Sequence, residues 1–212
     1  MKAIIGVLIW LAYVLPFGRW LNLRGIGNAI QRRWKREHKA PRAELVHADS
    51  PQGIRQFALS MKYKWREDAT RVGKKKLLLD WVSHPRVFQW RMEQDPFPEG
   101  DGDCDDYHNW FAACLRLLPE AVGVSNVMVV SSGYPGGGHT TCAYEQNGKK
   151  YHVNYRIAEI TDFNDIPQIV ADWAAAKDKE PVGSYHVTFY VFEAAYPQWK
   201  LLACGPKGKV KV

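Results

Sequence analysis

The pattern of hydrophobic and polar positions divides the chain into a mostly helical first half and a strand-rich second half. Over residues 104–118, apolar positions recur at helical spacing until Pro119 ends the run. Further helices are expected from Pro51, with Ser50 or Asp49 as the cap, and over residues 163–176, where a capping residue is also followed by an early proline. Apolar or alternating runs predict strands over residues 126–131, 139–146, 149–156, 185–192 and 199–204. Because helices come first and strands follow, the pattern predicts an α+β fold with a helix packed on an antiparallel sheet.

Glycine marks the two connections between the central strands. Residues 133–138 (GYPGGG) predict a flexible loop, and Asn147-Gly148 predicts a tight hairpin turn. With so short a turn, Asn154 on the return strand is expected to approach His139 near the open end of the hairpin.

An uncharged run of 15 residues, from 3 to 17, lies near the start of the chain and precedes a basic segment. A helix of that length spans roughly 22 Å, against about 30 Å of hydrocarbon in a bilayer. Three interpretations stay open: a membrane anchor over residues 3–23 with the domain in the cytoplasm, a cleaved signal peptide, or a hydrophobic helix packed in a larger assembly. We therefore expect residues 1–40 to form a leader and basic stem, and residues 41–212 to form the folded domain.

Charge is distributed unevenly along the chain. Residues 1–91 hold 19 Lys and Arg against 6 Asp and Glu, whereas residues 92–212 hold 10 against 16. The net charge of +7 alone would favour nucleic acid, but no nucleic-acid motif accompanies the basic stretch of residues 62–76. The basic half instead predicts contact with an anionic membrane surface. The last lysines, in residues 207–211, are expected to fray. Four cysteines in 212 residues exclude a small disulfide scaffold.

Cys104 stands where a turn-rich segment of Pro, Gly and Asp becomes the helix. The start of a helix lowers the pKa of a thiol, and the thiolate is the nucleophile. His139 is the expected base, and Asn154 would accept the imidazole N–H and fix its tautomer, with Asp162 and Asp165, past the strand, as alternatives. The three carboxylates beside Cys104 oppose a thiolate by their charge, namely Asp103, Asp105 and Asp106.

An oxyanion hole would complete such a thiol site. Its first donor is expected to be the backbone N–H of Cys104. The second is sought upstream, in Gln89, Trp90 or Gln94.

The stretch GDCDDY, residues 102–107, resembles the G-D-C-[DE]-D-Y motif of bacterial transglutaminase-like cysteine proteinases. These enzymes belong to the papain-like transglutaminase superfamily, and the resemblance covers about residues 95–156. It implies a papain-like core with Cys104 as nucleophile, His139 as general base and acid, and Asn154 as the orienting residue, where the family usually has Asp. The implied activity is amide-bond hydrolysis by a cysteine peptidase or amidase, or acyl transfer, through a thioester. The implied substrate is a protein or a peptide such as a peptidoglycan stem peptide, and no cofactor or metal is expected.

Two alternatives stay beside the enzyme. A domain that keeps the fold without activity would serve as a membrane or virion component, and phage-type proteins join such a domain to a hydrophobic leader. A zinc module would use a Cys2His2 set made of Cys104, His108, His139 and Cys142. A calcium loop starting at Asp101 is disfavoured, because the stretch lacks the glycine and the closing Glu of such loops.

Overall fold

The computed structural model describes residues 31, 35–61, 63, 70–72, 75–77, 82–94, 102–134, 137–154, 160–162, 185–193, 200–204 and 208–210. Over residues 70–77, 131–139 and 160–210 the description is of the backbone. Residues 35–39 are helical, and the later helices are α3 (Pro51–Ser60), α4 (Pro85–Met92), α5 (Cys104–Leu115) and the short 3-10 helix η2 (Glu120–Val122). A small hairpin lies between α3 and α4, made of β1 (Thr70–Val72) and β2 (Lys75–Leu77).

The main sheet follows the helices in the chain. Its strands are β3 (Val124–Tyr134), β4 (Gly137–Gln146), β5 (Lys149–Val153), β6 (Ile160–Asp162), β7 (Tyr185–Glu193), β8 (Lys200–Cys204) and β9 (Gly208–Val210). Their order is β6-β5-β4-β3-β7-β8, with β9 paired to the start of β7, and all of these pairs are antiparallel. This arrangement confirms the α+β class.

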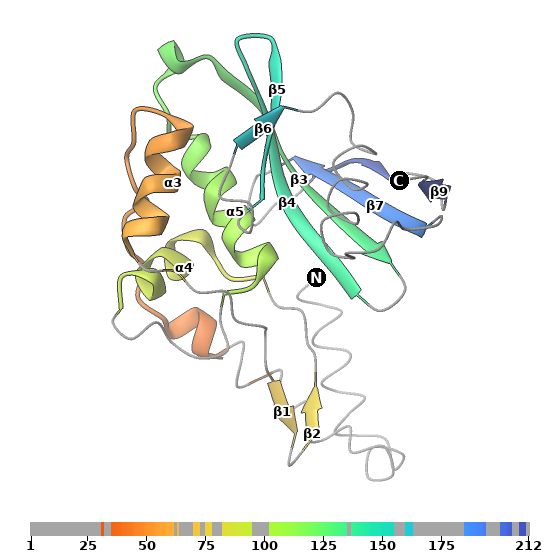
Figure 1. The fold of residues 1–212 in the computed structure, drawn as a ribbon. Coiled ribbons are helices and arrows are strands. Elements are labelled where there is room, and N and C mark those ends of the chain that lie inside the picture. The colour runs from red at the N-terminus through yellow and green to blue at the C-terminus, as the bar shows by residue number, and fades with distance from the viewer. Residues whose placement is uncertain are drawn as a thin grey trace.

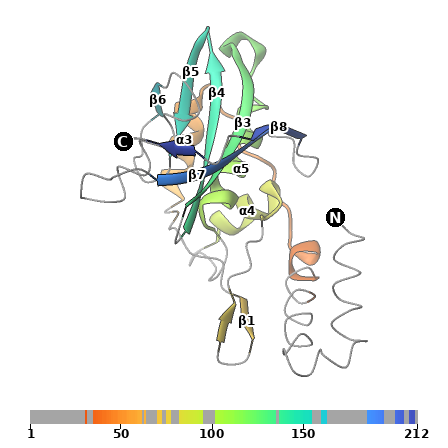
Figure 2. The same ribbon diagram turned by 90° about the vertical axis from the view of Figure 1, so that its right-hand side faces the viewer.

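The helices gather on one side of the sheet. Both views place α3, α4 and α5 together beside the β3–β4–β5 part, with the β1–β2 hairpin standing away from it (Figure 1 and Figure 2). Helix α5 contacts α3 and α4 as well as β3 and β4. It is therefore buried on nearly all sides, and ten of its 12 residues are buried.

The strand register shows which residues of the sheet belong to the core. Cys142 on β4 pairs with Val129 on β3 and with Val153 on β5. These three residues and Tyr144 form one hydrophobic cluster with α5, whose largest member is Trp110. Since side chains alternate along a strand, the β4 positions 142 and 144 face the helix, while 141 and 143 belong to the other side.

Local sequence signals fix several ends of these elements. Ser50 caps α3, because its hydroxyl accepts the N–H of Gly53 at 3.1 Å and Pro51 occupies the first helical position. Asn147 and Gly148 have φ values of 52° and 77°, which the tight turn between β4 and β5 requires. Both signals were predicted and are confirmed.

Three predictions about the strands were wrong. The expected glycine loop is short, because β3 continues to Tyr134 and β4 already begins at Gly137. Gly133 pairs with β4 on one side and with β7 on the other, so pairing on both sides outweighs the low strand propensity of glycine. Asn154 lies just after β5 rather than on it. The basic tail does not fray throughout, because β9 pairs with β7.

Two expected helices, the leader of residues 3–23 and residues 163–176, lie outside the described residues. In the described part of the chain, no helix combines the length and the apolar character needed to cross a bilayer. The predicted boundary between stem and domain at residue 40 stays a prediction, although Glu37 of the stem is buried against α4.

Candidate functional site

Cys104 is the first residue of α5. Asp103 precedes it as the N-cap, and its carboxylate accepts the backbone N–H of Asp105 at 3.3 Å. The first turn of a helix presents backbone N–H groups and a positive partial charge, which favour a thiolate. Cys104 is partly exposed, whereas Cys114 and Cys142 are buried. Cys104 is therefore the accessible thiol among the described side chains. Burial also raises the pKa of the Cys114 and Cys142 thiols.

The backbone just before Cys104 is held by a distant tyrosine. The hydroxyl of Tyr63 donates to the carbonyl oxygen of Gly102 at 2.8 Å and approaches that of Asp103 at 3.4 Å. The Tyr63 ring stacks on Tyr107, one turn into α5, with ring centroids 5.0 Å apart. Gly102 has φ 129°, a conformation that side-chain-bearing residues rarely adopt. The entry to the helix is therefore fixed by a glycine and by an aromatic clamp.

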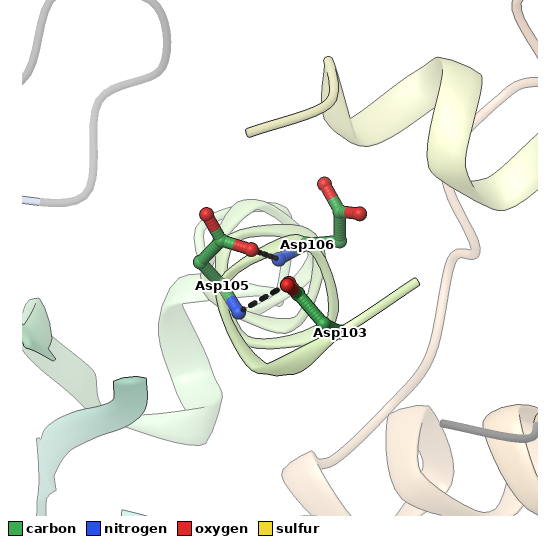
Figure 3. A group of neighbouring side chains, drawn as sticks. All are labelled: Asp103, Asp105 and Asp106. Carbon is green, nitrogen blue, oxygen red and sulfur yellow. Dashed lines mark hydrogen bonds between the residues drawn. The ribbon is translucent and has the colours of Figure 1, made fainter. Parts of the chain in front are cut away.

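Three carboxylates surround the start of α5, and each is held by a backbone amide. Asp105 accepts the N–H of Asp106 at 2.8 Å, and Asp106 accepts the N–H of Ser83 at 2.6 Å. Figure 3 shows the side chains of Asp105 and Asp106 diverging from the helix axis, with Asp103 in front of them. These hydrogen bonds stabilise the three charges at the helix start, where negative groups are favoured.

The same three carboxylates are the one group of possible metal ligands found among the described side chains. Their oxygen atoms lie within 4.8 Å of one another. Cys104, His108 and Cys142, three of the four residues in the predicted zinc set, form no such group. The Nδ1 atom of His108 lies 2.5 Å from the carbonyl oxygen of Cys104, and since a carbonyl can only accept, Nδ1 carries the proton. His108 is fully buried, and its structural role stays a prediction.

Gln89 was considered as an oxyanion donor, and the structure contradicts this. Its Oε1 atom accepts the indole N–H of Trp110 at 3.0 Å and the backbone N–H of Val46 at 2.8 Å. Its Nε2 atom donates to the carbonyl oxygen of Glu44 and to the carboxylate of Glu93. All of its amide atoms are therefore used inside the fold, where Gln89 is only 3% exposed.

Helix α5 and strand β4 meet at one surface hollow. Leu115, the last residue of α5, and Glu145, near the end of β4, both line it. Cys104 is the first residue of α5, 11 residues before Leu115, which corresponds to about 16 Å of helix. Cys104 therefore lies at the end of α5 that is remote from this hollow.

The register places His139 on β4 and Asn154 just after β5. His139 pairs with Ser132 in a ladder that runs without a bulge to Ala143. The β4–β5 ladder ends at the pair of Cys142 and Val153, so Asn154 is the first residue after the ladder. Asn154 is 3% exposed.

The alternation along β4 also limits how a Cys–His contact forms. The β4 residues packed on the middle of α5, Cys142 and Tyr144, alternate with positions 139 and 141. Position 139 therefore belongs by register to the side of β4 opposite to Cys142 and Tyr144, which pack on α5. The Cys104–His139–Asn154 triad stays a prediction.

Sequence reasoning missed the residues that hold the start of α5, above all Tyr63, Ser83 and Arg91. One signal pointed toward them, because Glu37 is the single acidic residue in the basic stretch 28–42. An isolated acid in such a stretch marks a position with a specific partner. In this structure that partner is Arg91, whose guanidinium lies 2.8 Å from the Glu37 carboxylate.

When the chain is compared with protein-family models, with curated proteins and with solved structures, it matches none of them.

Proposed function

We propose that the protein is a thiol-dependent amide-bond hydrolase with Cys104 as its nucleophile. One observation carries the proposal: the accessible thiol among the described side chains is the first residue of a capped helix. A helix start favours the thiolate that nucleophilic catalysis needs. A buried structural cysteine needs no such place, as Cys114 and Cys142 illustrate.

In the proposed reaction, the Cys104 thiolate attacks the acyl carbon of an amide. The tetrahedral oxyanion accepts a hydrogen bond from the backbone N–H of Cys104. The imidazolium of His139 gives its proton to the departing amine, and a thioester remains. Neutral His139 then takes a proton from water, and the hydroxide equivalent attacks the thioester and releases the acid and the thiolate. Asn154 orients the imidazole without adding charge.

The resemblance of GDCDDY to transglutaminase-like proteinases supports this choice, and a helix packed on an antiparallel sheet is the arrangement that a papain-like core requires. We propose that the protein has this papain-like core and acts on a protein or peptide substrate. We also propose that residues 3–23 attach it to a membrane. Hydrolysis is preferred to acyl transfer, because no sequence motif and no feature of the described residues marks a site for an amine acceptor.

The test is the rate of alkylation by iodoacetamide, followed for each cysteine by peptide mass spectrometry. Near pH 7, Cys104 should react at least tenfold faster than Cys114 and Cys142. His139→Ala and Asn154→Ala should each lower the rate of Cys104 alkylation and move the midpoint of its pH profile upward. His47→Ala is the matched control, since His47 is exposed and its described partner is the exposed Glu44. Slow labelling of all three thiols, or a His139→Ala variant with an unchanged profile, would overturn the proposal.

A further inference from the structure

We infer that Arg91 is a positioning residue for Cys104, which it influences through Ser83 and Asp106, and that Glu37 extends this control to the basic stem. The inference rests on the proposed role of Cys104 as a nucleophile. It adds to that role a buried connection between the stem and the first turn of α5, which we call the clasp and which consists of Glu37, Arg91, Ser83 and Asp106.

The first link of the clasp joins α5 to the start of α4. Asp106 is the third residue of α5, from where an acidic side chain often reaches back to the N–H of the N-cap. Here its Oδ1 atom instead accepts the N–H of Ser83 at 2.6 Å. Both residues are fully buried. The turn that carries Cys104 is therefore anchored to the segment preceding α4.

The second link determines where that N–H points. Arg91, in the last turn of α4, donates from Nη1 to the hydroxyl of Ser83 at 2.7 Å. Arg91 is 2% exposed, so its guanidinium is held in one orientation by its partners. By holding the side chain of Ser83, Arg91 fixes the peptide group that binds Asp106.

The third link reaches the stem. The Nη2 atom of Arg91 donates to Oε2 of Glu37 at 2.8 Å, and Oε1 of Glu37 accepts the N–H of His84 at 2.8 Å. The ion pair is buried on both sides, with 3% of the Arg91 side chain and 6% of the Glu37 side chain exposed. Loss of either partner leaves a buried charge uncompensated. A displacement of helical residues 35–39 would thus shift Ser83 and, through Asp106, the first turn of α5.

The test uses the full-length chain and the pH profile of Cys104 alkylation by iodoacetamide. Ser83→Ala removes the hydroxyl that Arg91 holds but keeps the N–H that Asp106 binds. Glu37→Gln removes the charge of the ion pair and nearly keeps the shape. Each variant should lower the rate of Cys104 alkylation at least threefold near pH 7 and shift the midpoint of its pH profile. Cys114 and Cys142 should stay as protected from alkylation as in the wild type. Arg91→Lys keeps the positive charge but loses the two guanidinium nitrogens that bind Ser83 and Glu37 separately. It should change the Cys104 alkylation profile as Ser83→Ala does.

Ser60→Ala is the matched control, because the Ser60 hydroxyl also makes a short hydrogen bond, 2.7 Å to the carbonyl of Phe57, on the exposed end of α3. It should leave the profile unchanged. The inference is overturned if Ser83→Ala and Glu37→Gln both keep the wild-type profile, or if they expose all three thiols equally, which indicates a purely structural role. The His139→Ala profile separates this result from the proposed function: a change with His139→Ala but not with the clasp variants refutes only the clasp, and a change with the clasp variants but not with His139→Ala overturns the proposed function while the influence of the clasp on the Cys104 thiol stands.

Discussion

The hydroxyl of Tyr63 donates a hydrogen bond of 2.8 Å to the carbonyl oxygen of Gly102, although 39 residues separate the two in the chain. Tyr63→Phe removes this bond and keeps the ring that stacks on Tyr107. We expect a loss of about 1 kcal/mol in the free energy of unfolding, the usual net value of one hydrogen bond. We also expect slower alkylation of Cys104, measured beside urea unfolding.

Tyr151→Phe is the control for this change, because Tyr151 also stacks on a tyrosine, Tyr144, with ring centroids 5.5 Å apart, but on the sheet. It should leave the Cys104 rate unchanged. A Tyr63→Phe protein with wild-type stability and reactivity would show that the clamp has no influence on the helix start.

Gly102 should tolerate a side chain poorly. At φ 129°, alanine is strained, and Gly102→Ala should cost about 1–3 kcal/mol and slow Cys104 alkylation, because strain there displaces the start of α5. Gly148→Ala offers a comparison, since Gly148 also has a positive φ, 77°, but a Cβ there meets nothing within 4 Å. That variant should lose about 1–2 kcal/mol with no effect on the thiol. Equal thiol rates in both variants would argue against this assignment.

Gln89 is expected to act in folding and not in oxyanion binding. Gln89→Met leaves the indole N–H of Trp110 and the N–H of Val46 without their acceptor. Each buried donor left unsatisfied costs about 1–3 kcal/mol, which thermal or urea unfolding will detect. Gln94→Met is the control for stability, because the Gln94 side chain lies just after α4 and its described hydrogen bond is a donation to the carbonyl of Trp90. A variant of Gln89 with unchanged stability but lower turnover would restore Gln89 as a catalytic candidate.

The free energy of unfolding should fall in alkaline solution. Burial raises the pKa of Cys114 and Cys142, and likewise that of Tyr107 and Tyr144, above the values in the unfolded chain. Above about pH 8.5 the thiols therefore ionise more readily in the unfolded chain, which binds fewer protons than the folded one. Stability from these groups is complete below that pH and decreases as the pH rises further, with the tyrosines adding to the slope above about pH 10.

Urea unfolding between about pH 7 and pH 10.5 measures this slope. Cys142→Ala removes one of the two buried thiols, so it should make the slope above about pH 9 shallower even though the cavity lowers stability at pH 7. A free energy of unfolding that stays constant across this range would contradict the burial of the thiols.

Local signals predicted those parts of the fold that depend on neighbouring residues. The cap at Ser50, the turn at Asn147-Gly148 and the start of α5 at Cys104 each rest on a few adjacent residues. The length of β3 did not follow from its own residues, because Gly133 is in a strand only through partners on both sides. The extent of a strand is decided by its pairing, which short-range patterns do not contain.

The candidate site divides in the same way. The GDCDDY motif and the place at a helix start made Cys104 the candidate nucleophile, which stays a prediction, whereas Asn154, expected on the return strand of the hairpin, lies just after β5. The supports of the site come from far along the chain: Tyr63 lies 39 residues from Gly102, and Glu37 lies 54 residues from Arg91. Such contacts depend on tertiary packing and leave no periodic trace in the sequence.

The position of α5 between two groups of elements has a consequence for synthesis. Its helical partners, α3 and α4, leave the ribosome before it, whereas its sheet partners, β3 and β4, leave after it. A nascent chain that ends before Gln146 can cover only one face of α5. The apolar face around Trp110 therefore stays uncovered until the β3–β4 hairpin is complete. The thiol of Cys104 therefore exists for a time in an unfinished domain, in which only the α3 and α4 side of α5 is covered.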